Sequence, residues 1–103
     1  MQIDQKHKAT LDKMIASNDP IYNFNKTIEE ATELTEVLIK RIVKEGGPKS
    51  PSDDSIIEEI GDLYIRLEIL SAKFGHTKVQ DRINYKMSKY ESYIKDNKYI
   101  GKI

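Results

Sequence analysis

Apolar residues of this chain recur every three or four positions in two long stretches, and one segment rich in glycine and proline separates the stretches. Such spacing places side chains on one face of an α-helix. The first stretch contains Ile28, Ala31, Leu34 or Thr35, Leu38 and Ile42, and the second contains Ile56, Ile60, Leu63, Leu67, Leu70 and Phe74. Gly46-Gly47-Pro48 ends the first stretch. We therefore predict two helices, over about residues 21–45 and 54–74.

Two further helices are expected at the ends of the chain. The first covers about residues 4–17 and ends before Asn18-Asp19-Pro20, because the residue before a proline resists the helical conformation. Gly75 closes the helix over 54–74, and Thr77-Lys78-Val79-Gln80 has the form of a capping box that opens a helix over about 77–95. Ser52 or Asp53 can cap the helix over 54–74. We expect one all-α domain over residues 1–103, an antiparallel bundle of about four helices.

Composition excludes several classes of protein. The 17 basic residues balance the 17 acidic ones, so no overall field attracts nucleic acid or a membrane surface. The chain has no cysteine, which excludes disulfides and thiolate metal sites. No apolar run approaches the length of a membrane span, and the first residues lack the pattern of a signal peptide. We expect a cytoplasmic protein with no nucleic-acid partner and no membrane partner.

Two acidic pairs are the strongest indication of chemistry. Glu30 and Glu33 lie three residues apart in one predicted helix, and Glu59 and Asp62 lie three apart in the next. Side chains at this spacing share a helical face. Four converging carboxylates would repel one another unless a cation lay between them, and hard divalent ions such as Mg²⁺ accept all-oxygen ligands. The pattern predicts a metal site made by these four side chains, or the acids can instead be solvated, since acidic pairs at this spacing are common on exposed helix faces.

The two acidic pairs lie at different distances from the turn between their helices, so the site requires the helices to be staggered. At ~1.5 Å per residue, the first pair lies ~20 Å from the turn between the helices and the second pair lies ~10 Å from it. The helices must therefore be staggered by ~10 Å. An eight-residue loop can span this distance, since extended chain covers ~3.3 Å per residue.

Cations and an aromatic side chain near the acidic pairs are candidate substrate contacts. Lys26 and Arg66 lie in the same two helices as the acids, and Lys86 and Lys89 lie in the predicted last helix. Each can meet a phosphate, or can instead be a surface cation paired with a nearby glutamate. Tyr22 can stack on a nucleobase, or can instead pack in a core or a dimer interface.

The helix over 54–74 carries apolar residues on more than one side. Ile57, Tyr64 and Ile69 lie away from its main apolar stripe. Apolar groups on several sides of one helix indicate burial against a second chain. We expect at least a homodimer, or a dimer of dimers, in which association completes the core and both chains can contact the substrate.

The sequence segments around the acidic residues resemble the motifs of the all-α nucleoside triphosphate pyrophosphatase superfamily, and those of its MazG-like branch in particular. The resemblance rests on Lys26-Thr27-Ile28-Glu29-Glu30-Ala31-Thr32-Glu33-Leu34 and on Ile57-Glu58-Glu59-Ile60-Gly61-Asp62-Leu63. Leu70-Ser71-Ala72-Lys73-Phe74-Gly75 also matches, and the likeness covers roughly residues 21–90. One position departs from the pattern: some relatives have a tyrosine four residues after the last aspartate, where this chain has Arg66.

The resemblance implies hydrolysis of a nucleoside triphosphate to the monophosphate and pyrophosphate with Mg²⁺, for which Mn²⁺ can substitute. It implies that Glu30, Glu33, Glu59 and Asp62 are the metal ligands, that Glu29 matches the leading glutamate of the motif, and that Lys86, followed by Lys89, meets phosphate. Three alternatives remain open. These are a phosphoribosyl-ATP pyrophosphohydrolase, a non-catalytic nucleotide-binding protein, and a helical interaction module whose acids are solvated. The preferred base and sugar do not follow from the residues.

Overall fold

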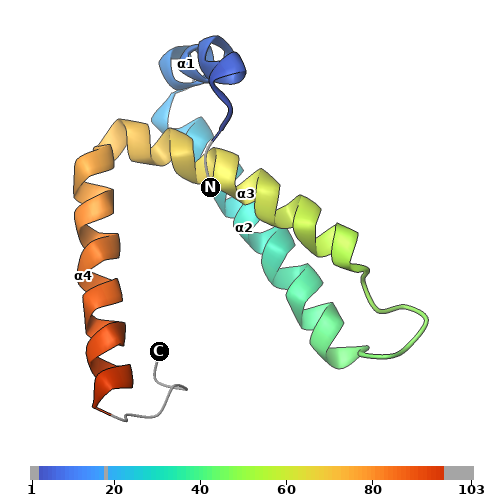
Figure 1. The fold of residues 1–103 in the computed structure, drawn as a ribbon. Helices are drawn as coiled ribbons and strands as arrows, with labels where there is room; N and C mark the ends of the chain where they lie inside the picture. The colour runs from blue at the N-terminus through green and yellow to red at the C-terminus, as the bar shows by residue number, and fades with distance from the viewer. Residues whose placement is uncertain (1–2, 18, 97–103) are drawn as a thin grey trace. The chain divides into compact units, whose positions relative to one another are not determined.

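The computed structural model describes residues 3–17 and 19–96, and its regular secondary structure in these ranges is all helix, with no strand. A short 3₁₀ turn, η1 (Gln5–His7), leads into α1 (Lys8–Ser17). Three longer helices follow: α2 (Pro20–Val43), α3 (Asp53–Phe74) and α4 (His76–Lys95) (Figure 1). The all-α prediction is confirmed. None of these helices combines the length and apolarity that a membrane span requires.

Side-chain caps fix where the two long helices begin. The Asp19 carboxylate accepts a hydrogen bond from the backbone N–H of Tyr22 at 2.9 Å, and Pro20 occupies the first turn. Proline suits this position because its missing N–H would have no partner there. At the start of α3, Ser52 Oγ accepts the backbone N–H of Ser55 at 3.2 Å. The prediction that Ser52 can cap this helix is confirmed.

The junction between α3 and α4 corrects one prediction. The helix cap is Gly75, with φ of 111° and no side-chain hydrogen bond, and α4 begins directly after it at His76. The N–H of Val79 bonds to the Gly75 carbonyl at 3.1 Å. Thr77 therefore lies inside the first turn and forms no capping box. Glycine is favoured here because residues that carry a side chain rarely adopt a positive φ.

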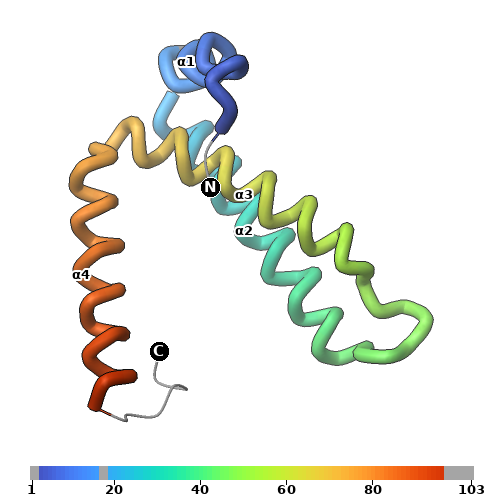
Figure 2. Tube along the Cα trace, in the orientation of Figure 1, coloured from blue at the N-terminus to red at the C-terminus, as the bar shows by residue number. Residues whose placement is uncertain are grey.

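Helices α2 and α3 form an antiparallel pair (Figure 2). Arg41, near the end of α2, donates to Asp53 Oδ1 at 2.8 Å and to the Pro51 carbonyl at 3.3 Å. These bonds tie the start of α3 to the last turns of α2. The turn between them passes through Gly46, whose φ of 76° favours glycine.

The apolar stripe predicted for α2 is only partly buried, since Ala31 and Leu34 are half-buried while the rest of it is exposed. Ile28, Leu38 and Ile42 are all exposed in the chain, whereas polar Asn23 is 3% exposed and Glu30 is half-buried. Among the described residues, Ile69 of α3 is the apolar side chain that is fully buried, at 1% exposure. The expectation that Ile69 faces a second chain is therefore wrong, since the chain itself encloses it.

The chain divides into two compact units, residues 1–72 and 73–103. The first holds α1, α2 and nearly all of α3. The second holds α4, which exposes Val79, Ile83, Met87 and Ile94. The single-domain organisation stays a prediction.

Candidate metal centre

Three of the four predicted ligands meet between α2 and α3. Glu30, Glu33 and Glu59 each offer a carboxylate oxygen, and these oxygens all lie within 4.8 Å of one another. All three residues are half-buried. Glu33 lies about 15 Å from the end of α2 and Glu59 about 9 Å from the start of α3, at ~1.5 Å per residue. The stagger between these two residues is therefore ~6 Å, smaller than the expected ~10 Å, because α2 ends two residues earlier and α3 begins one residue earlier than predicted.

Asp62 lies outside this group of three. It is exposed, one turn beyond Glu59 on α3. Its side chain is one methylene shorter than that of a glutamate, so from this position it reaches less far toward the seam. Its charge is nevertheless close enough to raise the pKa of Glu30. The expectation that four carboxylates meet therefore holds for three of them, with the fourth beside the group.

The electrostatics of the cluster follow from carboxylates sharing a partly buried site. Partial burial raises the pKa of Glu30, and the neighbouring charges of Glu33, Asp62 and Glu29 raise it further. Partial burial also raises the pKa of Glu33, where the hydrogen bond with Glu30 acts in the opposite direction and the charge of Glu59 adds to the rise. Loss of water and like charges both disfavour ionisation. A cation held among these oxygens would reverse that effect.

Two oxygens of the cluster are buried without a hydrogen-bond partner in the described part of the chain. They are Oε2 of Glu30 and Oε2 of Glu59. A buried acceptor that lacks a donor costs ~1–3 kcal/mol, and more when it is charged. Such atoms call for an explanation, of which an ion is one. The donor set, three carboxylates on two helices, suits a hard divalent cation.

The predicted cations of α2 and α3 lie beside the cluster. Lys26 donates to Glu29 Oε2 at 3.1 Å, and this bond raises the Lys26 pKa, while the charge of Arg66 opposes the rise. Arg66 is therefore near Lys26. Its NH1 is buried without a hydrogen-bond partner among the residues described. Tyr22, one turn before Lys26, is exposed at the same end of α2 and also favours the charged lysine.

The other two predicted phosphate contacts are on α4 and contact aromatic rings. Lys86 Nζ lies 5.1 Å from the centre of the Tyr90 ring, and Lys89 Nζ lies 6.0 Å from that of Tyr93. These are cation–π contacts between neighbouring turns of one helix. Their role toward phosphate stays a prediction.

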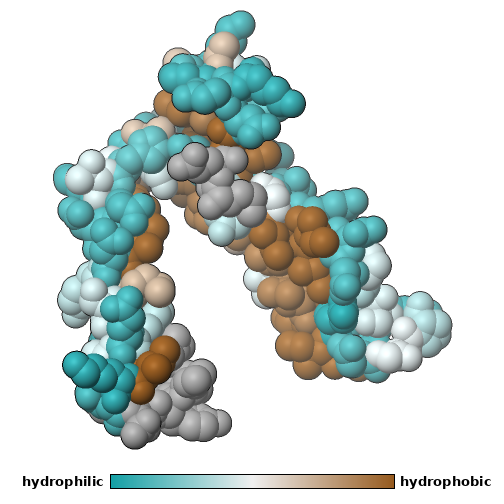
Figure 3. All heavy atoms as spheres, viewed as in Figure 1, coloured by the Kyte–Doolittle hydropathy of each residue, from teal (hydrophilic) through white to brown (hydrophobic). Residues whose placement is uncertain are grey.

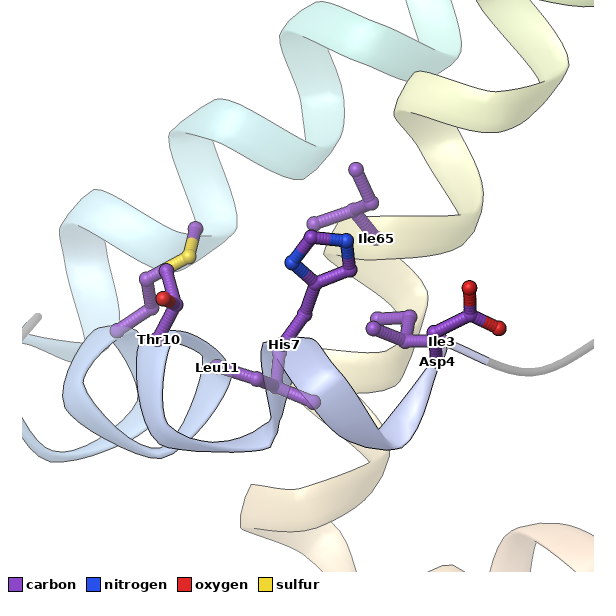
Figure 4. Close-up of a pocket in the computed structure, with 7 residues that line it drawn as sticks. Ile3, Asp4, His7, Thr10, Leu11 and Ile65 are labelled. Carbon is purple, nitrogen blue, oxygen red and sulfur yellow. The ribbon is translucent and has the colours of Figure 1, made fainter.

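A pocket lined mainly by residues of the N-terminal segment was not predicted from the sequence. It has a volume of about 450 Å³ and lies between the N-terminal segment and α3. Figure 4 shows the His7 imidazole turned toward Ile65. The lining residues are Ile3, Asp4, His7, Thr10, Leu11, Met14 and Ile65. His7 has no motif around it, so only the folded chain identifies this position.

Comparison of the chain with family models, with curated proteins and with solved structures found no match. Membership of the MazG-like branch therefore stays a prediction, which rests on the sequence motifs around the acidic residues.

Proposed function

We propose that this protein is a nucleoside triphosphate pyrophosphohydrolase that depends on Mg²⁺, with Mn²⁺ as a possible substitute. The observation that carries the proposal is the convergence of Glu30, Glu33 and Glu59 from two helices within 4.8 Å. Solvated surface glutamates would separate to reduce their repulsion. Instead these side chains stay half-buried and close together, at a cost in free energy that a bound cation would remove.

The residues of the cluster fit the chemistry of magnesium. Carboxylate oxygens are its usual protein ligands, and a few of them are enough because substrate phosphates and water complete the octahedron. The unpartnered Oε2 atoms of Glu30 and Glu59 are available for this purpose. Asp62, one turn away, is the proposed fourth ligand. Bound there, Mg²⁺ would neutralise phosphate charge and make the phosphorus more electrophilic.

Lys26 and Arg66 are the proposed contacts for the phosphate chain. They come from different helices and lie close enough for the charge of Arg66 to affect the Lys26 pKa. Two cations held together beside a metal site attract an anion of high charge. The buried NH1 of Arg66 is a donor with no acceptor among the described residues, and a phosphate oxygen can supply one. Tyr22 is proposed to contact the base, and Lys86 and Lys89 remain candidates for phosphate.

The proposed reaction is an in-line attack of water on the α-phosphorus. A bond forms between the water oxygen and that phosphorus, and the bond to the oxygen bridging the α- and β-phosphates breaks, so pyrophosphate leaves. The water loses a proton, which a carboxylate of the site can accept. Glu29 matches the leading glutamate of the motif, and its carboxylate is held by Lys26 at 3.1 Å. We propose that this pair orients Lys26 and positions Glu29 at the edge of the site.

Measuring released pyrophosphate against orthophosphate tests the proposal. A panel of ribo- and deoxynucleoside triphosphates is incubated with Mg²⁺ or Mn²⁺. Phosphoribosyl-ATP is included to distinguish the proposed enzyme from a phosphoribosyl-ATP pyrophosphohydrolase. We expect pyrophosphate and the monophosphate, with turnover falling about 100-fold or more in Glu30→Gln and Asp62→Asn, the scale seen when an electrostatic contact to the transition state is lost. Glu58→Gln, an exposed neighbour of the cluster, is the matched control and should keep activity.

Other outcomes of this panel separate the remaining alternatives. Absence of turnover by the unmodified protein, or full turnover by both site variants, rejects the enzyme. Calorimetric binding of a nucleotide without product would identify a binding protein. A melting temperature that does not respond to Mg²⁺ would identify a helical module with solvated acids. The proposed enzyme acts as a homo-oligomer.

A further inference from the structure

The zero net charge of the chain is the sum of two units of opposite charge. Residues 1–72 contain nine basic and 14 acidic side chains, a net charge of −5, and residues 73–103 contain eight basic and three acidic ones, a net charge of +5. Such asymmetry is typical of chains in which one part binds a polyanion. The charge balance that led us to expect no nucleic-acid partner therefore does not apply to the second unit by itself.

Four of the five cations of α4 form one stripe along the helix. They lie four, four and three residues apart, and at roughly 100° per residue they fall within an arc of about 80°. The two acidic residues of α4, Asp81 and Glu91, lie outside this arc. In Figure 3, α4 shows hydrophilic residues along one edge and apolar residues along the other. We call the four cations the basic stripe: Lys78, Arg82, Lys86 and Lys89.

Tyrosine rings, and not carboxylates, contact the basic stripe. Arg82 Cζ lies 5.1 Å from the centre of the Tyr85 ring, and the two lysines that follow make the contacts with Tyr90 and Tyr93 described above. None of the four cations forms an ion pair with a carboxylate among the described residues, whereas Lys26 and Arg41 of α2 both do. The rings carry no net charge, so the positive charge of the stripe is available to a partner.

The tyrosines also provide a surface on which a planar base can stack. Tyr85 is 58% exposed, and the Arg82 guanidinium over one face of its ring leaves the opposite face for a second planar group. By the same rotation, Tyr93 lies within the arc of the basic stripe and Tyr85 lies at its edge. Proteins that bind single strands combine cations that follow the backbone with aromatic side chains on which successive bases stack. Helix α4 has both features on one side.

We propose that the basic stripe and its tyrosines bind single-stranded nucleic acid. The four cations contact successive phosphates, and bases stack on Tyr85 and Tyr93. A duplex is a poorer match, because its bases are already stacked on one another. An anionic membrane is a poorer match as well. Glu91 lies about 40° around the helix from Met87, so it borders the apolar edge of α4 and would face the headgroups.

This inference goes beyond the proposed activity and does not depend on it. It uses residues of α4 alone and needs neither a metal ion nor the acidic cluster. Lys86 and Lys89 are also candidates for substrate phosphate, so the variants that test the inference are at Lys78 and Tyr85. Both positions are exposed, and their exchange should leave the helical circular dichroism unchanged.

Fluorescence anisotropy of a labelled oligothymidine of about 12 nucleotides tests the proposal with the full chain. The titration is made in chelator, which keeps divalent ions out of the acidic cluster. We expect binding at about 50 mM salt, with the logarithm of the affinity falling against that of the salt concentration with a slope of about −2 to −3. This slope corresponds to three or four neutralised phosphates on a single strand.

Two matched pairs of variants separate the charge from the stacking. Lys78→Gln should make the slope less steep by about 0.7, whereas the same exchange at exposed Lys40 of α2 should not change it. Tyr85→Ala should weaken binding roughly 5-fold or more, the effect of losing one stacked base. Tyr85→Phe keeps the ring and should keep the affinity.

Several results would overturn the proposal. These are no binding at about 50 mM salt, a duplex of the same length bound as tightly as the single strand, or vesicles with anionic lipid bound in place of the oligonucleotide. Equal slopes for the Lys78 and Lys40 variants, or full affinity in Tyr85→Ala, would also reject it. Loss of binding in Glu30→Gln would place the strand at the acidic cluster instead. Because no hydrolysis is measured, a protein without pyrophosphohydrolase activity still gives a clear answer.

Discussion

The two sides of the α2–α3 pair reverse the usual placement of side chains. On one side and in the seam, carboxylates approach each other and two of their oxygens are buried without partners in the described residues. On the other side, isoleucine and leucine face solvent. A stable isolated pair would bury the apolar stripe and expose the acids. This reversal is what the proposed metal site and the proposed association of the chain would each account for.

The largest expected effect is on the side with the acidic cluster: loss of the rise in melting temperature that Mg²⁺ should cause. An ion at 100 times its dissociation constant stabilises by ~2.7 kcal/mol, which is roughly 10 °C in melting temperature for a domain of this size. Glu59→Gln should abolish this rise with Mg²⁺, measured by thermal unfolding with and without the ion. Glu58→Gln, on the adjacent exposed position, should keep it. An equal rise in both variants would place the ion elsewhere.

Removing a charge from the seam should stabilise the metal-free protein. Glu30 is held near other carboxylates with a buried oxygen that no described residue satisfies. Glu30→Gln keeps the shape and removes the repulsion, so the melting temperature in chelator should rise by roughly 2–5 °C. The same exchange at exposed Glu36 should change it little. A lower melting temperature for Glu30→Gln would mean that the carboxylate contributes to folding without an ion.

The pH dependence of stability should have opposite signs without and with metal. The pKa values of Glu30 and Glu33 are raised from 4.5, so the folded chain binds their protons more tightly than the unfolded chain does. Metal-free stability should therefore increase as the pH falls through the raised pKa values toward 4.5, and decrease as the pH rises through them. With Mg²⁺, acid should lower stability, because protons displace the ion.

Chemical unfolding between pH 7 and about 5 measures both slopes over the range in which perturbed carboxyl groups titrate. Glu30→Gln is the control and should flatten the metal-free slope, which would assign that slope to the cluster. A metal-free slope that is unchanged in this variant would assign the pH dependence to other groups.

The smallest expected effect concerns the ion pair between the end of α2 and the start of α3, which belongs neither to the acidic cluster nor to the exposed apolar side. Arg41 bonds to Asp53 at 2.8 Å, yet the Asp53 side chain is largely exposed. Exposed ion pairs contribute ~0.2–1 kcal/mol. A double-mutant cycle with Arg41→Met and Asp53→Asn, followed by urea unfolding, should give a coupling energy in that range. A much larger coupling would show that this contact sets the stagger that brings Glu33 to Glu59.

Local structure was largely predictable from the sequence. The predicted boundaries of α2, α3 and α4 lie within two residues of those in the structure, because caps and helix breakers act over a few residues. The capping box predicted at Thr77 was wrong. Gly75 is the N-cap of α4, with a positive φ, so Thr77 lies inside the helix. The acidic spacing also predicted which side chains would meet, apart from the shorter Asp62.

The sequence by itself determined the helices, the loop that joins the long pair, and the presence of two carboxylate pairs at one-turn spacing. Only the tertiary structure decided which face of α2 would meet α3, and so placed Glu30 in the seam and left Ile28 and Ile42 exposed. Periodicity identifies an apolar stripe but not its partner, because burial depends on contacts between residues far apart in the chain. For the same reason the pocket at His7 and Ile65 emerged only after folding.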